Sequence, residues 1–291
     1  MVDLGNNQMQ RIVLYADLLG FRSQVKALAL RDVVHSLKSV LYSVCAGAIR
    51  YAVSLRVDDI VSSLPTLDWD DPGFSNVVEE LRKRTGLSAL LMSDTVVVYS
   101  EPLMPENPEF QERLASMLLV GRILMMKLFE FHLPARGAIA FGEFYADARN
   151  SIFCGRGLVE SYEVAESQEW IGMSICDSLE AYVDALVDTF SIEIWVSGMK
   201  GERWRTVRPD WEIIRYEVPH KQDPKERWTV NWSSAWNYGG PVCDEFFADQ
   251  MTGRKDVDLK YENTLKYLQW LHERRLAGAW PRYDFGTAKD A

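Results

Sequence analysis

Two acidic residues interrupt apolar segments that otherwise have the character of buried strands. In "YADLLGF", residues 15–21, Asp17 stands between an apolar run and a Gly-Phe turn, and in "LLMSDTVVVYS", residues 90–100, Asp94 stands between two apolar runs. A carboxylate at a strand end can bind a divalent metal ion, while the backbone amides of the adjoining turn bind phosphate oxygens. Two such carboxylates can hold two ions that activate an attacking hydroxyl and neutralise a leaving pyrophosphate.

A plainer interpretation is that Asp17 and Asp94 only form turns or cap helices, since aspartate is favoured in both places. Their predicted positions on neighbouring strand ends of one sheet favour the metal-binding role, because two close carboxylates repel each other unless a cation lies between them. Gly20 supports the same role, since a side chain at this turn would block the close approach of a phosphate.

The periodicity of the apolar residues predicts the elements that position these acids. "RIVLYA" (11–16) is a buried strand, and one or two helices follow it, interrupted near "ALALRD" and around Gly47. "LSALLM" and "TVVVYS" form a hairpin with Ser93 and Asp94 at its tip. A helix at 108–132, a strand in "PARGAIAFGEFY", a helix at 157–167 and a strand in "WIGMSI" complete the series. The buried side of the 108–132 helix is expected to carry Phe110, Leu114, Met117, Leu118, Leu124, Leu128 and Phe129.

This order predicts an α/β (α+β) fold, in which a ferredoxin-like split βαβ sheet is covered by helices on one face. Residues 1–190 form the predicted catalytic domain, and the acidic, turn-rich stretch at about 56–76 is an insertion in it. Residues 191–291 are a Trp-rich extension of strands and a final helix, predicted to pack on the same domain.

Composition limits the partners and the compartment. The chain has 291 residues and a net charge of −10, so a broad basic surface for nucleic acid is not expected. No apolar run is long enough to span a membrane, and we expect no direct membrane insertion. The four cysteines are widely spaced and are predicted to be reduced thiols in the cytoplasm.

These motifs, taken in order, resemble the class III nucleotidyl cyclases over residues 11–176. "LYADLLGF" looks like their first strand and turn, and "MSDTVVVY" looks like the hairpin in which a small residue, here Ser93, precedes the second metal-binding Asp. "ARGAIAFGEF", followed by "CGRGLVESYEVA", is similar to their Arg-containing strand and the helix after it. A relative of the diguanylate cyclases is disfavoured, because their Gly-Gly-Asp/Glu-Glu-Phe hairpin is missing.

The resemblance implies a catalytic domain of the class III cyclase fold and assigns roles to several residues. Asp17 and Asp94 would bind two Mg²⁺ or Mn²⁺ ions per site, and Leu18 would contribute a backbone carbonyl. The residues that would lie along the triphosphate, or otherwise contact the nucleotide, are Leu19, Gly20, Phe21, Arg22 and Ser93.

The chain departs from the purine cyclases at the positions that read the base and support the transition state. Their base-reading Lys, four residues before the second metal Asp, is Leu90 here. Their Asn and Arg, four residues apart on a helix, correspond to Val159 and Glu163 when counted from Gly155. Counted from Gly157, they correspond to Ser161 and Ala165, so neither register restores the pair.

This combination is similar to the pyrimidine cyclases of Pycsar antiphage defence. The resemblance implies a homodimer with composite sites that converts UTP to 3',5'-cyclic UMP, whose product acts on a separate cyclic-nucleotide-binding effector. Cyclic CMP synthesis, adenylate cyclase activity and a catalytically inactive nucleotide-binding module are the alternatives. Tyr51 is the candidate contact to the smaller base, or else a Tyr packed on the sheet. Arg136 could face phosphate or serve as an ion-pair partner, and Arg156 could replace the missing Arg.

Overall fold

The computed structural model describes residues 9–54, 79, 82–83, 85–189, 192–196, 203–207, 213–235 and 254–276. Its centre is a seven-stranded sheet with the order β10-β11-β7-β4-β1-β3-β2. The bounds of these strands are β1 Gln10–Leu18, β2 Leu87–Met92, β3 Thr95–Ser100, β4 Ala135–Glu143, β7 Gly172–Ile175, β10 Ile213–Val218 and β11 Lys225–Val230.

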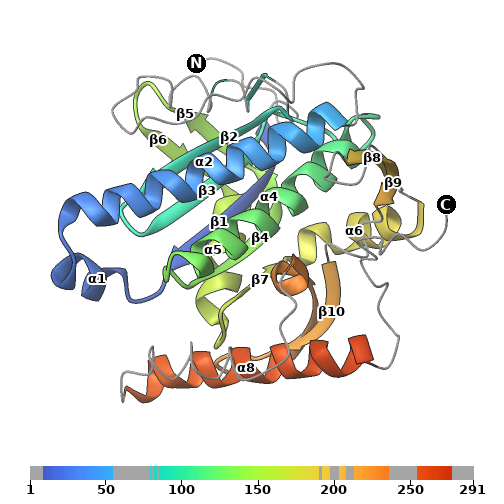
Figure 1. Ribbon diagram of the computed structural model, residues 1–291. Helices are drawn as coiled ribbons and strands as arrows, with labels where there is room; N and C mark the ends of the chain where they lie inside the picture. The colour runs from blue at the N-terminus through green and yellow to red at the C-terminus, as the bar shows by residue number, and fades with distance from the viewer. Residues whose placement is uncertain are drawn as a thin grey trace.

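The ferredoxin-like core is made of the four strands β4-β1-β3-β2 and two helices. Helix α2 (Leu30–Ser54) connects β1 to β2, and helix α4 (Phe110–Glu130) connects β3 to β4. β1 is antiparallel to both of its neighbours, β3 and β4, so each βαβ unit is split by a strand of the other. Figure 1 shows α2 and α4 lying side by side across one face of this sheet. The predicted α/β class and ferredoxin-like order are confirmed.

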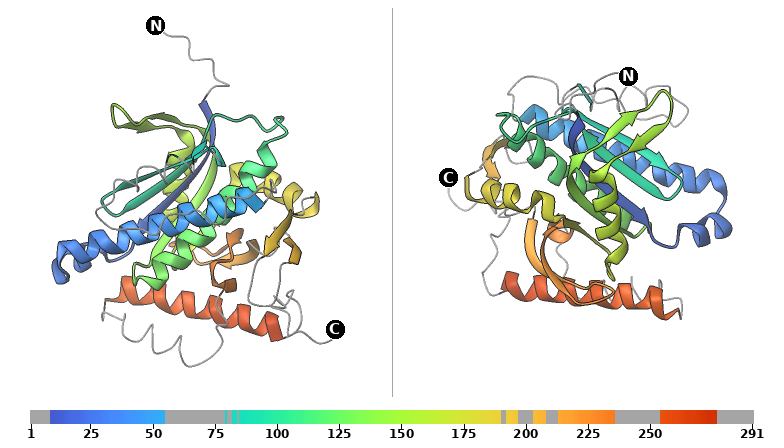
Figure 2. Two further views of the ribbon diagram at one scale, coloured as in Figure 1. Left: turned by 45° about the horizontal axis from the view of Figure 1, so that its top comes forward. Right: turned by 180° about the vertical axis from the view of Figure 1, so that it is seen from behind.

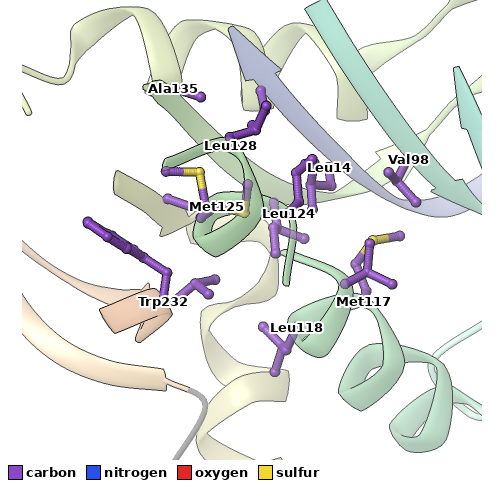
Figure 3. Close-up of a cluster of buried hydrophobic side chains, with 14 of the residues drawn as sticks. Leu14, Val98, Met117, Leu118, Leu124, Met125, Leu128, Ala135 and Trp232 are labelled. Carbon is purple, nitrogen blue, oxygen red and sulfur yellow. The ribbon is translucent and has the colours of Figure 1, made fainter. Parts of the chain in front are cut away.

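Strict alternation along β1 separates the two faces of the sheet. Ile12, Leu14, Ala16 and Leu18 are buried in the main core. Figure 3 shows Leu14 and Val98 of the sheet beneath the side chains of α4, with Trp232 at the edge of the same cluster. The seven α4 residues expected on the buried side are all buried. The opposite face of β1 carries Val13, Tyr15 and Asp17, so the acid lies on the face away from α2 and α4.

The prediction that helices cover one face only was wrong, because α5 (Arg156–Ser167) packs against β4 and β1 on the opposite face. Its buried residues are small, namely Gly157, Ser161 and Ala165. A Cβ on Gly142 would lie 3.1 Å from the backbone nitrogen of Gly157, so the helix can approach the strand only at a glycine. The adjoining hairpin of β5 (Tyr145–Asp147) and β6 (Ile152–Cys154) projects from one end of the sheet (Figure 2).

Other boundaries differ from expectation in detail. The segment after β1 contains two helices, since α1 (Phe21–Ala27) ends where the predicted "ALALRD" interruption begins, but α2 continues through Gly47 without a break. The strand predicted in "PARGAIAFGEFY" comprises β4 and β5, and the one in "WIGMSI" is β7. Helix α6 (Asp177–Thr189) was not anticipated from the sequence. The predicted insertion at 56–76 lies outside the described residues.

Beyond residue 190, β8 (Ile192–Val196) pairs with β9 (Arg203–Val207), whereas β10 and β11 extend the main sheet beside β7. The short helix η4 (Trp232–Ala235) and the long helix α8 (Lys255–Leu276) follow. Figures 1 and 2 show α8 beside the curved strand β10. The rings that join α8 to the sheet are those of Trp170, Tyr216, Tyr267 and Trp270. None of the described helices has the length and apolar character needed to cross a membrane.

If the C-terminal strands share the core of the catalytic segment, Trp232→Ala should destabilise the whole protein. The Trp232 side chain is fully buried, and its ring centroid lies 4.9 Å from that of Phe129 on α4. Truncation of such a ring costs about 3–5 kcal/mol. Urea unfolding should therefore show one transition at a lower midpoint. The partly exposed Trp228 is the matched control, and its alanine variant should lose less. A main transition that Trp232→Ala leaves unmoved would mean that the extension unfolds separately.

Candidate active site

The site is organised around Asp17, near the end of the inner strand β1. Thr95 of β3 is its cross-strand neighbour on one side, and Arg136 of β4 is its neighbour on the other. The backbone N–H of Leu18 donates to the backbone carbonyl of Asp94 at 2.8 Å, which joins the end of β1 to the β2–β3 turn. The structure therefore brings the two predicted metal ligands to the same edge of the sheet.

Two turns with positive φ end the strands at this edge. Gly20 has a φ of 72°, which is a conformation that glycine adopts without steric cost, and α1 begins at the next residue. Ser93, the first of the two residues in the β2–β3 turn, has a φ of 57°. The Leu19 N–H donates to the carbonyl of Pro134 at 2.7 Å. The backbone N–H groups of Leu18 and Leu19 thus donate to carbonyls of the protein. The phosphate contacts predicted for this turn would therefore be made by Gly20, Phe21 and Arg22.

Arg136 is the cation nearest to Asp17. Its Nη2 lies 3.4 Å from Oδ2 of Asp17 and also contacts Oε1 of Glu166, while its Nη1 donates to the backbone carbonyl of Glu166 at 3.1 Å. The Arg136 side chain is only 10% exposed, so these contacts neutralise a charge that would otherwise be costly to bury. Arg136 is therefore an ion-pair partner of Asp17 in this structure. Its predicted contact with phosphate remains a prediction.

Burial raises the pKa of the Asp17 carboxyl above its ordinary value. Arg136 acts in the opposite direction, whereas the negative charges of Glu166 and Asp94 raise the pKa further. The net effect is that the ionised carboxylate is disfavoured where it stands. A divalent cation between Asp17 and Asp94 would remove this penalty.

The donor set fits a magnesium or manganese ion that is shared with a substrate. Among the residues that the structure describes, the Asp17 carboxylate accepts a hydrogen bond only at Oδ2, and the Asp94 carboxylate accepts none. The same residues contain no group of three or more His, Cys, Asp or Glu side chains that could hold a metal. Mg²⁺ is commonly bound by one or two carboxylates, with waters and substrate phosphates as its other ligands. Asp17, Asp94 and the carbonyl of Leu18 suit that mode of binding.

Leu90 lies on the same face as Asp17, one row of side chains further along the sheet. Register pairing places Leu90 beside Val97, Val97 beside Tyr15, and Tyr15 beside Ala138. Val97 and Tyr15 are buried, whereas Leu90 is partly exposed. Leu90, Val97 and Tyr15 therefore form an apolar row beside the row that contains Asp17.

The remaining candidates do not all gather at this edge. Arg156 begins α5, with its side chain 89% exposed and its Nε 3.5 Å from Glu143. Glu166, which contacts the site, lies ten residues along the same helix, or about 15 Å at the rise of an α-helix. Within one chain, Arg156 therefore lies at the start of α5, whereas Asp17 lies close to the other end of this helix. Tyr51 lies in α2, but its side chain is outside the described residues.

Glu166 was missed by the sequence analysis. It lies in the last turn of α5, where a negative charge is opposed by the negative end of the helix dipole. An acid in that position was the available signal, since it is stabilised there only by a cationic partner. That partner is Arg136, 30 residues away in the chain, and no spacing rule connects the two.

The raised pKa of Asp17 predicts that Asp17→Asn stabilises the metal-free protein at neutral pH. Below the ordinary aspartate pKa of 3.8, Asp17 is protonated in both the folded and the unfolded state, and the two proteins should have similar stability. As pH rises through the raised folded pKa, the stability contributed by the protonated carboxyl is lost. With a chelator present, the Tm of the Asn variant at neutral pH should exceed that of the wild type by a few degrees.

Asp177→Asn is the control of opposite sign. Burial raises the pKa of Asp177, but the ion pairs with Lys225 and Arg227 outweigh burial and leave the pKa lowered. Its carboxylate therefore contributes stability at neutral pH that is lost on acidification, and the Asn variant should melt at a lower temperature. A lower Tm for both variants at neutral pH would show that ionised Asp17 does not destabilise the folded protein.

Comparison with known proteins gives structural neighbours only. No protein-family model matches the chain, and no curated protein matches it in sequence. The catalytic core of a rhodopsin-guanylyl cyclase with converted specificity, solved with ATPalphaS, has a TM-score of 0.42 at 11% identity over 77% of this chain and 95% of its own. The guanylyl cyclase Cya2 has a TM-score of 0.38 at 14% identity over 82% and 97%. A class III adenylyl cyclase-like ATP-binding protein from Pseudomonas aeruginosa has a TM-score of 0.34 at 11% identity over 67% and 38%. Likenesses of this size carry no information about the reaction of this chain.

Proposed function

We propose that this protein is a metal-dependent nucleotidyl cyclase that converts UTP to 3',5'-cyclic UMP and pyrophosphate. The observation that carries the proposal is the junction of Asp17 and Asp94 at one edge of the sheet, fixed by the Leu18–Asp94 hydrogen bond. A simple turn-forming or capping role would not require two acids, 77 positions apart in the chain, to be placed so that the charge of Asp94 adds to the cost of ionising Asp17. Their placement suits a site that is completed by cations and a polyphosphate.

In the proposed reaction, the 3'-hydroxyl of the nucleotide attacks its own α-phosphorus. A new bond forms between the 3'-oxygen and the α-phosphorus, and the bond between the α-phosphorus and the oxygen that bridges it to the β-phosphorus breaks. Pyrophosphate leaves, and the hydroxyl proton passes to solvent. Bound Mg²⁺ or Mn²⁺ ions supply the charge that activates the hydroxyl and stabilises the leaving group. Asp17 and Asp94 hold that charge in place, and the turn of Gly20, Phe21 and Arg22 lies where the triphosphate would extend.

The preference for a pyrimidine is supported by what stands at position 90. A purine-reading Lys is replaced by Leu90, whose partly exposed side chain adjoins the buried pair Val97 and Tyr15. An apolar surface does not supply a donor to a base edge, so the base must be read by other contacts. The choice of UTP over CTP, and a role in antiphage defence with a separate effector, follow the resemblance of the motifs to the Pycsar cyclases.

A homodimer with composite sites is part of the proposal. Arg156 is exposed and lies about 15 Å along α5 from the residue that contacts Arg136. If Arg156 supports the transition state, it must therefore act on the site of another copy. The exposed Val159 and Tyr162 on the same helix give α5 an apolar surface suited to such a contact.

A panel of nucleotides tests the activity. The purified protein is incubated with ATP, GTP, CTP or UTP and Mn²⁺, and the products are analysed by mass spectrometry. UTP should give 3',5'-cyclic UMP, and Asp17→Asn or Asp94→Asn should lower the rate about 100-fold or more, since metal clamping contributes several kcal/mol to the transition state. Asp177 is a surface acid on α6, and the Asp177→Asn variant should retain activity. No cyclic nucleotide from any substrate would refute the proposal, and cyclic AMP or cyclic CMP would refute only the choice of UTP.

Mixing inactive variants tests the composite site. If Arg156 serves the partner's site, a mixture of Asp17→Asn and Arg156→Ala chains forms heterodimers in which one site carries both changes and the other carries neither. Random exchange in a symmetric dimer should then restore about a quarter of the wild-type rate. A mixture that stays as inactive as its components, under conditions where mass spectrometry detects the heterodimer, would contradict a trans-acting Arg156.

A second candidate function is a nucleotide-binding module without turnover. One observation favours it. Arg136, the cation next to Asp17, is bound to Glu166, so it does not stabilise a transition state in the site of its own chain. Calorimetry with UTP separates the two functions. Binding that persists in Asp17→Ala without metal, and without any product, would favour the module.

A further inference from the structure

Glu166 is the residue at this site for which the proposed reaction has no role. It lies in the last turn of α5 and is 31% exposed, and one of its carboxylate oxygens contacts Nη2 of Arg136. Its other oxygen, Oε2, lies 3.7 Å from Nζ of Lys221 in the β10–β11 turn. The backbone carbonyl of the same residue accepts a hydrogen bond from Nη1 of Arg136 at 3.1 Å. Glu166 therefore binds Arg136 through both its side chain and its main chain.

Asp17 is the weaker partner of the same guanidinium. The one hydrogen bond between them joins Nη2 to Oδ2 at 3.4 Å. An arginine next to a single carboxylate commonly forms two parallel hydrogen bonds to both oxygens. Here that arrangement is prevented, because Nη1 is committed to the carbonyl of Glu166 and Nη2 is shared with its carboxylate.

We propose that Glu166 is a positioning residue whose carboxylate draws Nη2 of the Arg136 guanidinium away from Asp17 and so keeps the Asp17 carboxylate available to a divalent cation. This inference rests on the proposed metal-dependent function. Without the Glu166 carboxylate, Nη2 of Arg136 would turn fully toward Asp17 while Nη1 stays bound to the main-chain carbonyl, and an incoming cation would have to displace an arginine. With Glu166 in place, Arg136 partly neutralises Asp17 but leaves Oδ1 open.

The test measures Mn²⁺ binding to the full-length protein without nucleotide, from the electron paramagnetic resonance signal of free Mn²⁺. Glu166→Gln keeps the shape of the side chain and removes its charge. It should raise the Kd for Mn²⁺ about tenfold, the scale of one charge-assisted hydrogen bond. The readout is a metal affinity, which a purely structural role of Glu166 would not change in protein that is folded by circular dichroism.

Glu180→Gln is the matched control. Glu180 on α6 pairs with Arg215 of β10, and this arginine is likewise shared with an aspartate, Asp184. The substitution removes the same charge from the same kind of Glu–Arg–Asp group, but at a distance from Asp17 and Asp94. Its Kd for Mn²⁺ should equal that of the wild type.

A double-mutant comparison separates positioning from simple attraction of the cation by a nearby negative charge. In an Arg136→Met background there is no guanidinium to restrain, so the additional Glu166→Gln change should alter the Kd less than about twofold. An equal effect of Glu166→Gln in both backgrounds would overturn the inference, since Glu166 would then act directly on the ion. If Arg136→Met does not fold, Arg136→Lys provides the second background, because an ammonium group lacks the Nη2 that Asp17 and Glu166 share.

Two further outcomes distinguish this inference from the proposed function. If Asp17→Asn weakens Mn²⁺ binding but Glu166→Gln does not, the positioning role is wrong and the metal site stands. If Asp17→Asn binds Mn²⁺ as the wild type does, there is no metal site at Asp17, and the proposed function and this inference both fail.

Discussion

The architecture of this protein depends on placing one carboxylate, Asp17, near the end of an inner strand of the sheet, where burial disfavours its charge. β1 is one of the two inner strands of the ferredoxin-like core, and its residues on the other face, such as Leu14, form the main core under α4. The strand therefore cannot shift its register to expose Asp17 without moving that apolar set out of the core. Arg136 lowers the cost of the buried charge, whereas the negative charges of Glu166 and Asp94 raise it. A site that needs a cation is the consequence.

The C-terminal extension is connected to this site through the end of α5. The backbone N–H of Glu169 donates to the carbonyl of Pro219, and that of Lys221 donates to the carbonyl of Ser167, both at 2.8 Å. Lys221 also approaches Glu166, which in turn holds Arg136. The β10–β11 turn thus supports the segment that fixes the guanidinium beside Asp17. The extension contributes to the geometry of the site as well as to the core.

The local features of the site could be predicted from the sequence, whereas its long-range partners could not. Apolar periodicity located β1, the β2–β3 hairpin and α4, and it placed Asp17 and Asp94 at strand ends. The contact between Arg136 and Glu166 depends on which face of the sheet α5 covers. The close approach of Gly142 and Gly157 permits α5 to pack on that face, but the spacing of residues in the chain does not encode it.

The central claim is that Asp17 and Asp94 bind divalent metal together. A crystal structure of the protein with Mn²⁺ and a non-hydrolysable UTP analogue tests it most directly, because anomalous scattering locates the manganese independently of the protein geometry. The account predicts an anomalous peak within coordination distance of carboxylate oxygens from both Asp17 and Asp94, with phosphate oxygens on its open side. Manganese bound elsewhere, with Asp17 still paired only to Arg136 at saturating metal, would contradict it.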